Sequence, residues 1–147
     1  MSTAKSNGVV TVQPYLFFLG RCEEAIEFYR KAVGAEVEML MRFKDCPETP
    51  KEGCGNIPGD RVMHASLKIG KASVLVSDGH SEGKPNFQGF SLSLTTENEA
   101  EAEKAFGALS AGGKVEMPLT KTFFTPKFGM LEDKFGVGWM IYVAPKG

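Results

Sequence analysis

Two periodicities of apolar residues along this chain predict strands and helices. Apolar and polar residues alternate with a period of two in residues 90–95, where Phe90, Leu92 and Leu94 are separated by polar side chains. This alternation is typical of a strand with one buried face. Residues 21–33 instead place apolar side chains three and four positions apart, with charged residues between them, which predicts an amphipathic helix. Gly34 then suits the C-cap of that helix.

The whole chain yields eight strands and two helices by these criteria. Strands are expected at residues 9–19, 35–43, 61–69, 72–78, 90–95, 114–120, 128–132 and 139–144. The second helix should start at a capping box formed by Thr96 and Glu99 and end at Gly112. Pro14 predicts an edge position or a bulge for the first strand, since proline cannot donate to a sheet.

The two halves of the chain repeat one pattern. Residues 23–39 align without a gap with residues 101–117, and Val37-Glu38-Met39 recurs as Val115-Glu116-Met117. Because a fixed repeat outweighs local propensity, we predict an α+β fold of two tandem βαβββ units. We expect residues 1–8 to be a frayed tail and residues 9–147 to form a single domain with units at 9–84 and 85–147.

Composition and charge narrow the function. The 147 residues carry 17 basic and 18 acidic side chains, a formal net charge of −1. Nucleic-acid and membrane-surface partners usually require a basic field, so neither is expected. No apolar run approaches the length of a membrane span, and three cysteines without a CxxC spacing argue against a disulfide framework. We therefore expect a cytoplasmic protein with reduced thiols.

Several segments resemble the vicinal oxygen chelate superfamily, which includes glyoxalase I, bleomycin-resistance proteins and extradiol dioxygenases, and within it the PhnB-like branch. They are Pro14-Tyr15-Leu16, residues 25–29, Met63-His64-Ala65, Ser77-Asp78, Thr122-Phe123-Phe124, Phe128-Gly129 and residues 133–141. The resemblance implies a curved, half-open barrel-like sheet with helices outside and a cavity on its concave side. It also implies a homodimer, in some members with units paired across chains. The methyltransferase label that some PhnB-like members carry is set aside, since no glycine-rich S-adenosylmethionine loop is recognised.

Superfamily enzymes hold a divalent metal in that cavity. The resemblance places the ligand positions at or beside Pro14, near Phe90 or Ser91, and at Met140, where enzymes usually carry His, Glu or Gln. A catalytic metal needs about three protein ligands. Asp78 is the only carboxylate near such a position, so we expect no superfamily-type metal centre and no cofactor.

The remaining candidates are residues that could line a pocket. If Ala65 faces a helix, His64 and Ser66 face the concave side, and Asp78 on the next strand could neighbour His64. Such a pair could perform acid–base catalysis, although a structural histidine explains the pattern as well. Candidate ligand-binding residues are Leu16, Phe18, His64, Ser66, Asp78, Phe123, Phe124 and Met140.

These observations predict small-molecule binding in the concave cavity without a metal. The alternative is a metal-dependent lyase, isomerase or dioxygenase of the glyoxalase type. Whether the chain is an enzyme is left open by its sequence, because one scaffold carries many reactions.

Overall fold

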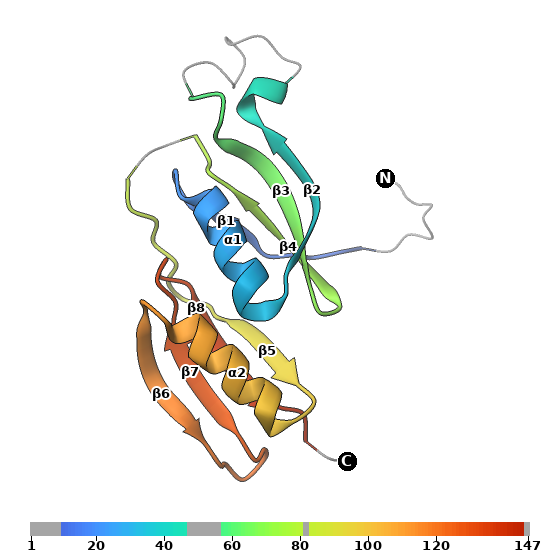
Figure 1. The fold of residues 1–147 in the computed structure, drawn as a ribbon, viewed down its shortest axis with the longest axis vertical. Helices are drawn as coiled ribbons and strands as arrows, with labels where there is room; N and C mark the ends of the chain where they lie inside the picture. Colours follow the sequence, from blue (N-terminus) through green and yellow to red (C-terminus); the bar gives the residue numbers. More distant parts are fainter. Residues whose placement is uncertain (1–9, 47–56, 81–82, 146–147) are drawn as a thin grey trace.

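The computed structural model describes residues 10–46, 57–80 and 83–145, and Figure 1 shows its arrangement. The described residues form these elements in chain order: β1 (Tyr15–Phe17), α1 (Cys22–Val33), β2 (Glu36–Arg42), the 3-10 turn η1 (Phe43–Asp45), β3 (Val62–Ile69), β4 (Ala72–Ser77), β5 (Leu92–Thr96), α2 (Glu99–Ser110), β6 (Lys114–Thr120), β7 (Phe128–Glu132) and β8 (Gly138–Val143). The expected α+β fold is confirmed.

The two halves have the same topology. The first sheet has the strand order β1-β4-β3-β2 and the second the order β5-β8-β7-β6. Each contains one parallel pair, β1 with β4 and β5 with β8, and is otherwise antiparallel. Each sheet carries its own helix on one face (Figure 1). The tandem βαβββ repeat predicted from residues 23–39 and 101–117 is therefore confirmed.

Both repeats contain a β-bulge at the same place. The pairing of β2 with β3 shifts register between Val37 and Met39, and that of β6 with β7 shifts between Val115 and Met117. The additional residue is a glutamate each time, Glu38 in the first sheet and Glu116 in the second. A bulge places one extra residue opposite the partner strand and re-aims its side chain.

The two units share one hydrophobic core. Phe18 of the first unit contacts Phe135 of the second, and the ring centres lie 5.7 Å apart. The hydroxyl of Tyr29 on α1 donates a hydrogen bond of 2.6 Å to Asp133, which follows β7. Asp133 is buried and also accepts from the Trp139 indole nitrogen at 2.9 Å. Apolar and polar contacts therefore join the halves into one body.

Helix boundaries follow local chemistry, with one difference from expectation. Gly34 ends α1 in the left-handed conformation with φ 69°, as predicted. The N-cap of α2 is Asn98, whose side-chain oxygen accepts from the Glu101 amide at 2.8 Å. The expected Thr96–Glu99 capping box is wrong, because the Thr96 hydroxyl instead donates to the carbonyls of Asn98 and Tyr142.

The first strand and the cysteines also differ from expectation. β1 spans only Tyr15–Phe17, although it is an edge strand, as Pro14 indicated. Cys22 is a free, buried cysteine, and burial raises the pKa of its thiol. Cys46 is disulfide-bonded, so the expectation of reduced thiols is wrong at this position. Cys54 and the predicted tail lie outside the described residues.

No helix in the described part of the chain is long and apolar enough to cross a membrane.

Candidate functional site

The first sheet leaves the face opposite α1 open. Val74 and Val76 of β4 point into the core, as do Ala65 and Leu67 of β3. The residues that alternate with them form the open face: Tyr15, Phe17, Met39, Met41, His64, Ser66, Lys68, Ser73, Leu75 and Ser77. Tyr15 is 39 % exposed and Phe17 is 48 % exposed, so the face is accessible to a ligand.

A tyrosine–histidine pair lies on the open face. The hydroxyl oxygen of Tyr15 and Nδ1 of His64 are 2.7 Å apart, although the two residues lie on β1 and β3 with β4 between them. Tyr15 also stacks on Phe17 with ring centres 4.9 Å apart. Partial burial raises the pKa of Tyr15, so its phenol stays protonated and can donate to a neutral imidazole.

A carboxylate is fixed on the same face by two serines. Oε1 of Glu38 accepts hydrogen bonds from the hydroxyls of Ser66 (2.7 Å) and Ser73 (2.9 Å). These bonds, followed by the charge of Lys68, lower the pKa of Glu38. Glu38 is the bulged residue of β2, and the bulge explains how its side chain reaches strands β3 and β4. Sequence reasoning missed Tyr15, Glu38 and Ser73, although the repeated Val-Glu-Met segment was the available signal.

Asp78 does not neighbour His64, so that part of the acid–base hypothesis is wrong. Asp78 is only 2 % exposed and has the same strand parity as Val74 and Val76, which face α1. Its carboxylate accepts hydrogen bonds from the backbone amides of Gly20 (2.7 Å), Cys22 (2.8 Å) and Val62 (2.9 Å). Asp78 therefore holds the start of α1 against β3.

The other predicted residues fall in three separate places. Leu16 and Phe18 are buried in the core rather than on the open face, because β1 presents Tyr15 and Phe17 there instead. His64 and Ser66 do share the open face, as expected. Met140 lies on the second sheet, paired with Met130, whereas Phe124 contacts Phe128 and Tyr142 from the loop after β6. Phe123 is fully exposed.

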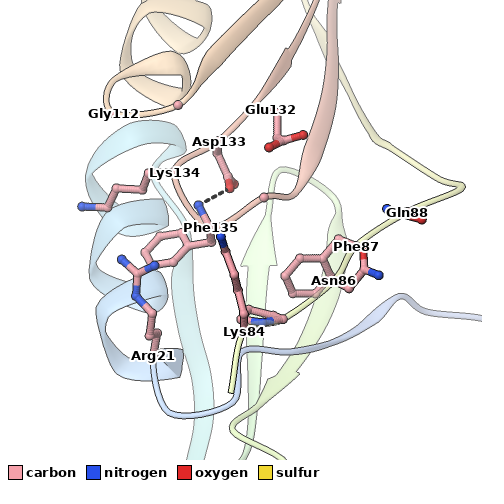
Figure 2. Close-up of a pocket in the computed structure, with 13 residues that line it drawn as sticks. Arg21, Lys84, Asn86, Phe87, Gln88, Gly112, Glu132, Asp133, Lys134 and Phe135 are labelled. Carbon is pink, nitrogen blue, oxygen red and sulfur yellow. Dashed lines mark hydrogen bonds between the residues drawn. The ribbon is translucent and has the colours of Figure 1, made fainter. Parts of the chain in front are cut away.

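A separate hollow lies where the two units meet (Figure 2). It has a volume of about 420 Å³ and is formed by Arg21, residues 84–88 of the connection between units, Gly112-Gly113 and residues 132–136. We call it the seam pocket. Its lining includes Arg21, Lys84 and Lys134 together with the amides of Asn86 and Gln88.

The described residues do not provide the ligand set of a superfamily metal site. No group of three His, Cys, Asp or Glu side chains in 10–46, 57–80 and 83–145 is placed to hold an ion. On the open face, His64 is bonded to Tyr15 through Nδ1 and Glu38 to two serines through Oε1, and these two donors are fewer than the about three protein ligands that a catalytic metal needs. Met140 offers only a thioether, which suits soft metals rather than hard divalent cations. The donor chemistry therefore does not fit, and the metal-free cavity stays a prediction.

Comparisons with known proteins identify relatives over nearly the full chain. Residues 10–142 match the family described as 3-demethylubiquinone-9 3-methyltransferase. Protein YjdN of Escherichia coli K12 is 35 % identical over 138 residues, which cover 90 % of this chain and 94 % of YjdN.

Solved structures are also similar to nearly the full chain. Protein PA1353 from Pseudomonas aeruginosa is 37 % identical with a TM-score of 0.81, covering 94 % of this chain and 100 % of that one. A PhnB protein from Bacillus cereus, described as a putative 3-demethylubiquinone-9 3-methyltransferase, is 28 % identical with a TM-score of 0.75, covering 92 % and 100 %. A glyoxylase/bleomycin resistance protein/dioxygenase domain from Frankia shares the fold, with a TM-score of 0.62 at 15 % identity over 93 % and 97 % of the chains.

Proposed function

Because the chain belongs to the family described as 3-demethylubiquinone-9 3-methyltransferase, the PhnB family of the glyoxalase/bleomycin-resistance/dioxygenase superfamily, we propose that it binds a small organic molecule on the open face of its first sheet. The observation that carries the proposal is the Tyr15–His64 pair, 2.7 Å apart on an exposed sheet surface. Ligand sites typically combine apolar walls with a few oriented polar groups. Tyr15 and Phe17 supply the apolar wall, and His64, Ser66 and Glu38 supply the polar groups.

A second copy of the chain would close this site. In one chain the halves meet through α1 and α2 rather than through their open faces, so the first sheet is a single wall (Figure 1). A cavity needs an opposite wall, and the second sheet of a partner chain offers one of the same topology, carrying Met140 and Tyr142. This arrangement is the paired-unit homodimer that the superfamily resemblance implies.

Methyl transfer is not part of the proposal. Doubly wound folds bind nucleotide-like cofactors at the carboxyl ends of parallel strands, next to a glycine-rich turn. Here each four-stranded sheet has a single parallel pair, and the turn between β1 and α1 contains one glycine, Gly20, whose amide is bonded to Asp78. These features support binding rather than the activity in the family description.

Ligand screening with variants of the Tyr15–His64 pair and a histidine control tests the proposal. A ligand that binds only the folded state raises the melting temperature, so hits are sought by thermal shift and measured by titration calorimetry. His64→Ala and Tyr15→Phe each remove one partner of the Tyr15–His64 pair and should weaken binding about tenfold, the effect of one lost polar contact. His80→Ala is the matched control, because exposed His80 contacts Phe43 away from the open face.

The outcomes separate the rival functions. Wild-type affinity in both His64→Ala and Tyr15→Phe would contradict the proposed site. Binding that disappears in chelator and returns only with added divalent ions would favour the metal-dependent lyase, isomerase or dioxygenase.

A further inference from the structure

We propose that the seam pocket is a second binding site, specific for a small aromatic anion such as a carboxylate or phosphate carried on a flat ring. It contains none of the open-face side chains, so the proposal is independent of the function proposed above. Its volume of about 420 Å³ lies within the range of small-molecule sites, roughly 300–1,000 Å³.

The pocket is built from both units. Arg21 comes from the start of α1, whereas residues 132–136 form the turn between β7 and β8 of the second unit. Figure 2 shows these segments on one side of the hollow and the connection 84–88 on the other. A ligand here would touch both halves of the repeat.

Arg21 is held in place while one of its nitrogens stays available. Its Nε and Nη2 donate to the two carboxylate oxygens of Glu24 at 3.1 and 3.0 Å, and the guanidinium lies 4.6 Å from the centre of the Phe135 ring. These contacts use one edge of the guanidinium and fix its plane. Within the described residues Nη1 makes no hydrogen bond, so it can donate to a ligand oxygen.

Lys84 supplies a second positive charge. In Figure 2 its side chain extends from the connection toward the turn that holds Asp133 and Phe135. No hydrogen bond or ion pair is found for Lys84 in the part of the chain that the structure describes. Lys134, in contrast, points away from the connection, and its Nζ lies 3.7 Å from Glu24. Lys84 is therefore the pocket's uncommitted cation.

Asp133 is a buried acidic residue of the lining, and its negative charge acts on Arg21. Asp133 is 2 % exposed, and its two oxygens accept four hydrogen bonds, from Tyr29, Trp139 and the amides of Phe135 and Val137. Its lone pairs are directed to these donors and away from a ligand. Glu132, on β7, is the remaining acidic group of the lining.

The rest of the lining favours a flat ring with polar edges. The Phe87 ring is partly exposed and is supported from behind by Phe18, with ring centres 5.3 Å apart. The amides of Asn86 and Gln88 flank it and have no hydrogen-bond partner within the described residues. An aromatic ring can stack on Phe87 while its anionic group meets Arg21 and Lys84.

The test uses three probes of nearly equal shape and different charge. Benzoate, benzamide and benzamidine are titrated by calorimetry, and amide signals are followed by NMR. We expect benzoate to bind at least tenfold more tightly than either other probe, with shifts at Phe87, Gln88 and Gly136. Lys84→Gln should weaken benzoate binding at least tenfold, the size of one lost charge-assisted bond. Lys84→Arg should restore it to within about threefold.

Lys71→Gln is the matched control, because Lys71 is an exposed lysine in the turn between β3 and β4. It should bind benzoate like the wild type. The proposal is overturned if benzamide binds as well as benzoate, if Lys84→Gln retains wild-type affinity, or if benzoate shows no binding up to about 10 mM.

Discussion

Asp78 acts as a structural carboxylate that ties together two segments distant in sequence. Three backbone amides, from Gly20, Cys22 and Val62, donate to its two oxygens. Cys22 is the first residue of α1 and Gly20 lies two residues before it, at the helix end where the dipole favours a negative charge. Burial makes each bond costly to lose, since a backbone amide without a partner pays its full desolvation penalty.

Substitution of Asp78 should therefore affect stability rather than ligand binding. Asp78→Asn keeps the shape of the side chain but replaces one acceptor oxygen by an NH₂ group. This group is a donor and faces a backbone N–H that is also a donor. We expect the free energy of unfolding to fall by about 2–4 kcal/mol in urea denaturation, because a buried charge-assisted bond is lost. Folded Asp78→Asn protein should bind open-face ligands with wild-type affinity. If Asp78→Asn instead binds ligand more weakly while its stability is unchanged, Asp78 belongs to the ligand-binding site.

Residue placement was predictable where alternation is clear and not where it is absent. Alternation predicts His64 and Ser66 on the open face, because they alternate with the apolar residues Ala65 and Leu67. The same parity places Asp78 with Val74 and Val76, so its burial was available from the sequence. Leu16 and Phe18 lie in a continuous apolar run, residues 15–19, in which period two gives no signal.

At the scale of elements, Tyr29 links α1 to the turn between β7 and β8. Its hydroxyl donates to Asp133 at 2.6 Å, and its ring lies 5.7 Å from that of Trp139. Burial, followed by the negative charge of Asp133, raises the pKa of Tyr29 above its ordinary value of 10.0. The protonated phenol therefore contributes to the attachment of the first helix to the second unit.

The raised pKa predicts a loss of stability in alkali. Unfolded Tyr29 releases its proton near its ordinary pKa of 10.0, while folded Tyr29 retains it. This stabilisation is complete below pH 10 and declines as the pH rises further. Unfolding free energies measured from pH 7 to 11 should fall above about pH 10 in the wild type. Tyr29→Phe should show a shallower fall and about 1–3 kcal/mol less stability at pH 7.

The buried Cys22 thiol also affects the stability measured in alkali. The pKa of Cys22 is also raised, from an ordinary value of 9.0, so its contribution begins to decline at a lower pH and persists in Tyr29→Phe. An alkaline slope identical in both proteins would contradict a role for Tyr29.

Element boundaries were predicted best where glycines or a turn sequence lie directly beside a strand. β6 follows Gly112-Gly113 and begins at Lys114 as expected, and β7 ends at Glu132 before the Asp133–Gly136 turn. The α2 cap was misassigned because Thr96 and Asn98 both suit an N-cap. Tertiary contact decided between them, since the Thr96 hydroxyl reaches the Tyr142 carbonyl on β8.

At the scale of the whole molecule, the open face of the first sheet predicts self-association. Phe17 on β1 is 48 % exposed and stacks on Tyr15, which is an unusual arrangement for a surface that meets only water. We expect a dimer in analytical ultracentrifugation. Phe17→Glu should weaken it at least tenfold, because a charge on an apolar interface must be desolvated.

Val37→Glu provides the matched control for this variant. Val37 is also an exposed apolar residue of an edge strand, but it pairs with core-facing Leu67 and so has the parity of the helix side. It should leave the dimer unchanged. A wild-type protein that sediments as a monomer at about 100 μM would contradict the homodimer and with it the closed cavity.

The overall architecture could be predicted and the seam pocket could not. The repeat predicts two units of one topology, because one βαβββ pattern occurs twice along the chain, and the structure confirms this. The seam pocket brings together Arg21, residues 84–88 and residues 132–136, which no local period connects. Such a site depends on how the two units pack, which is a property of the shared core rather than of either unit.

The parallel pairing of β1 with β4 has a consequence for protein synthesis. Tyr15 pairs with Leu75, and Asp78 then binds the Gly20 amide, so both contacts join the beginning of the first repeat to its end. A growing chain therefore cannot complete its first sheet until residue 78 has left the ribosome, and β5 must wait in the same way for β8. During synthesis the first strand of each half is therefore exposed without its pairing strand. An exposed, unpaired apolar strand can aggregate with other chains, so this is the stage at which the nascent chain most needs protection.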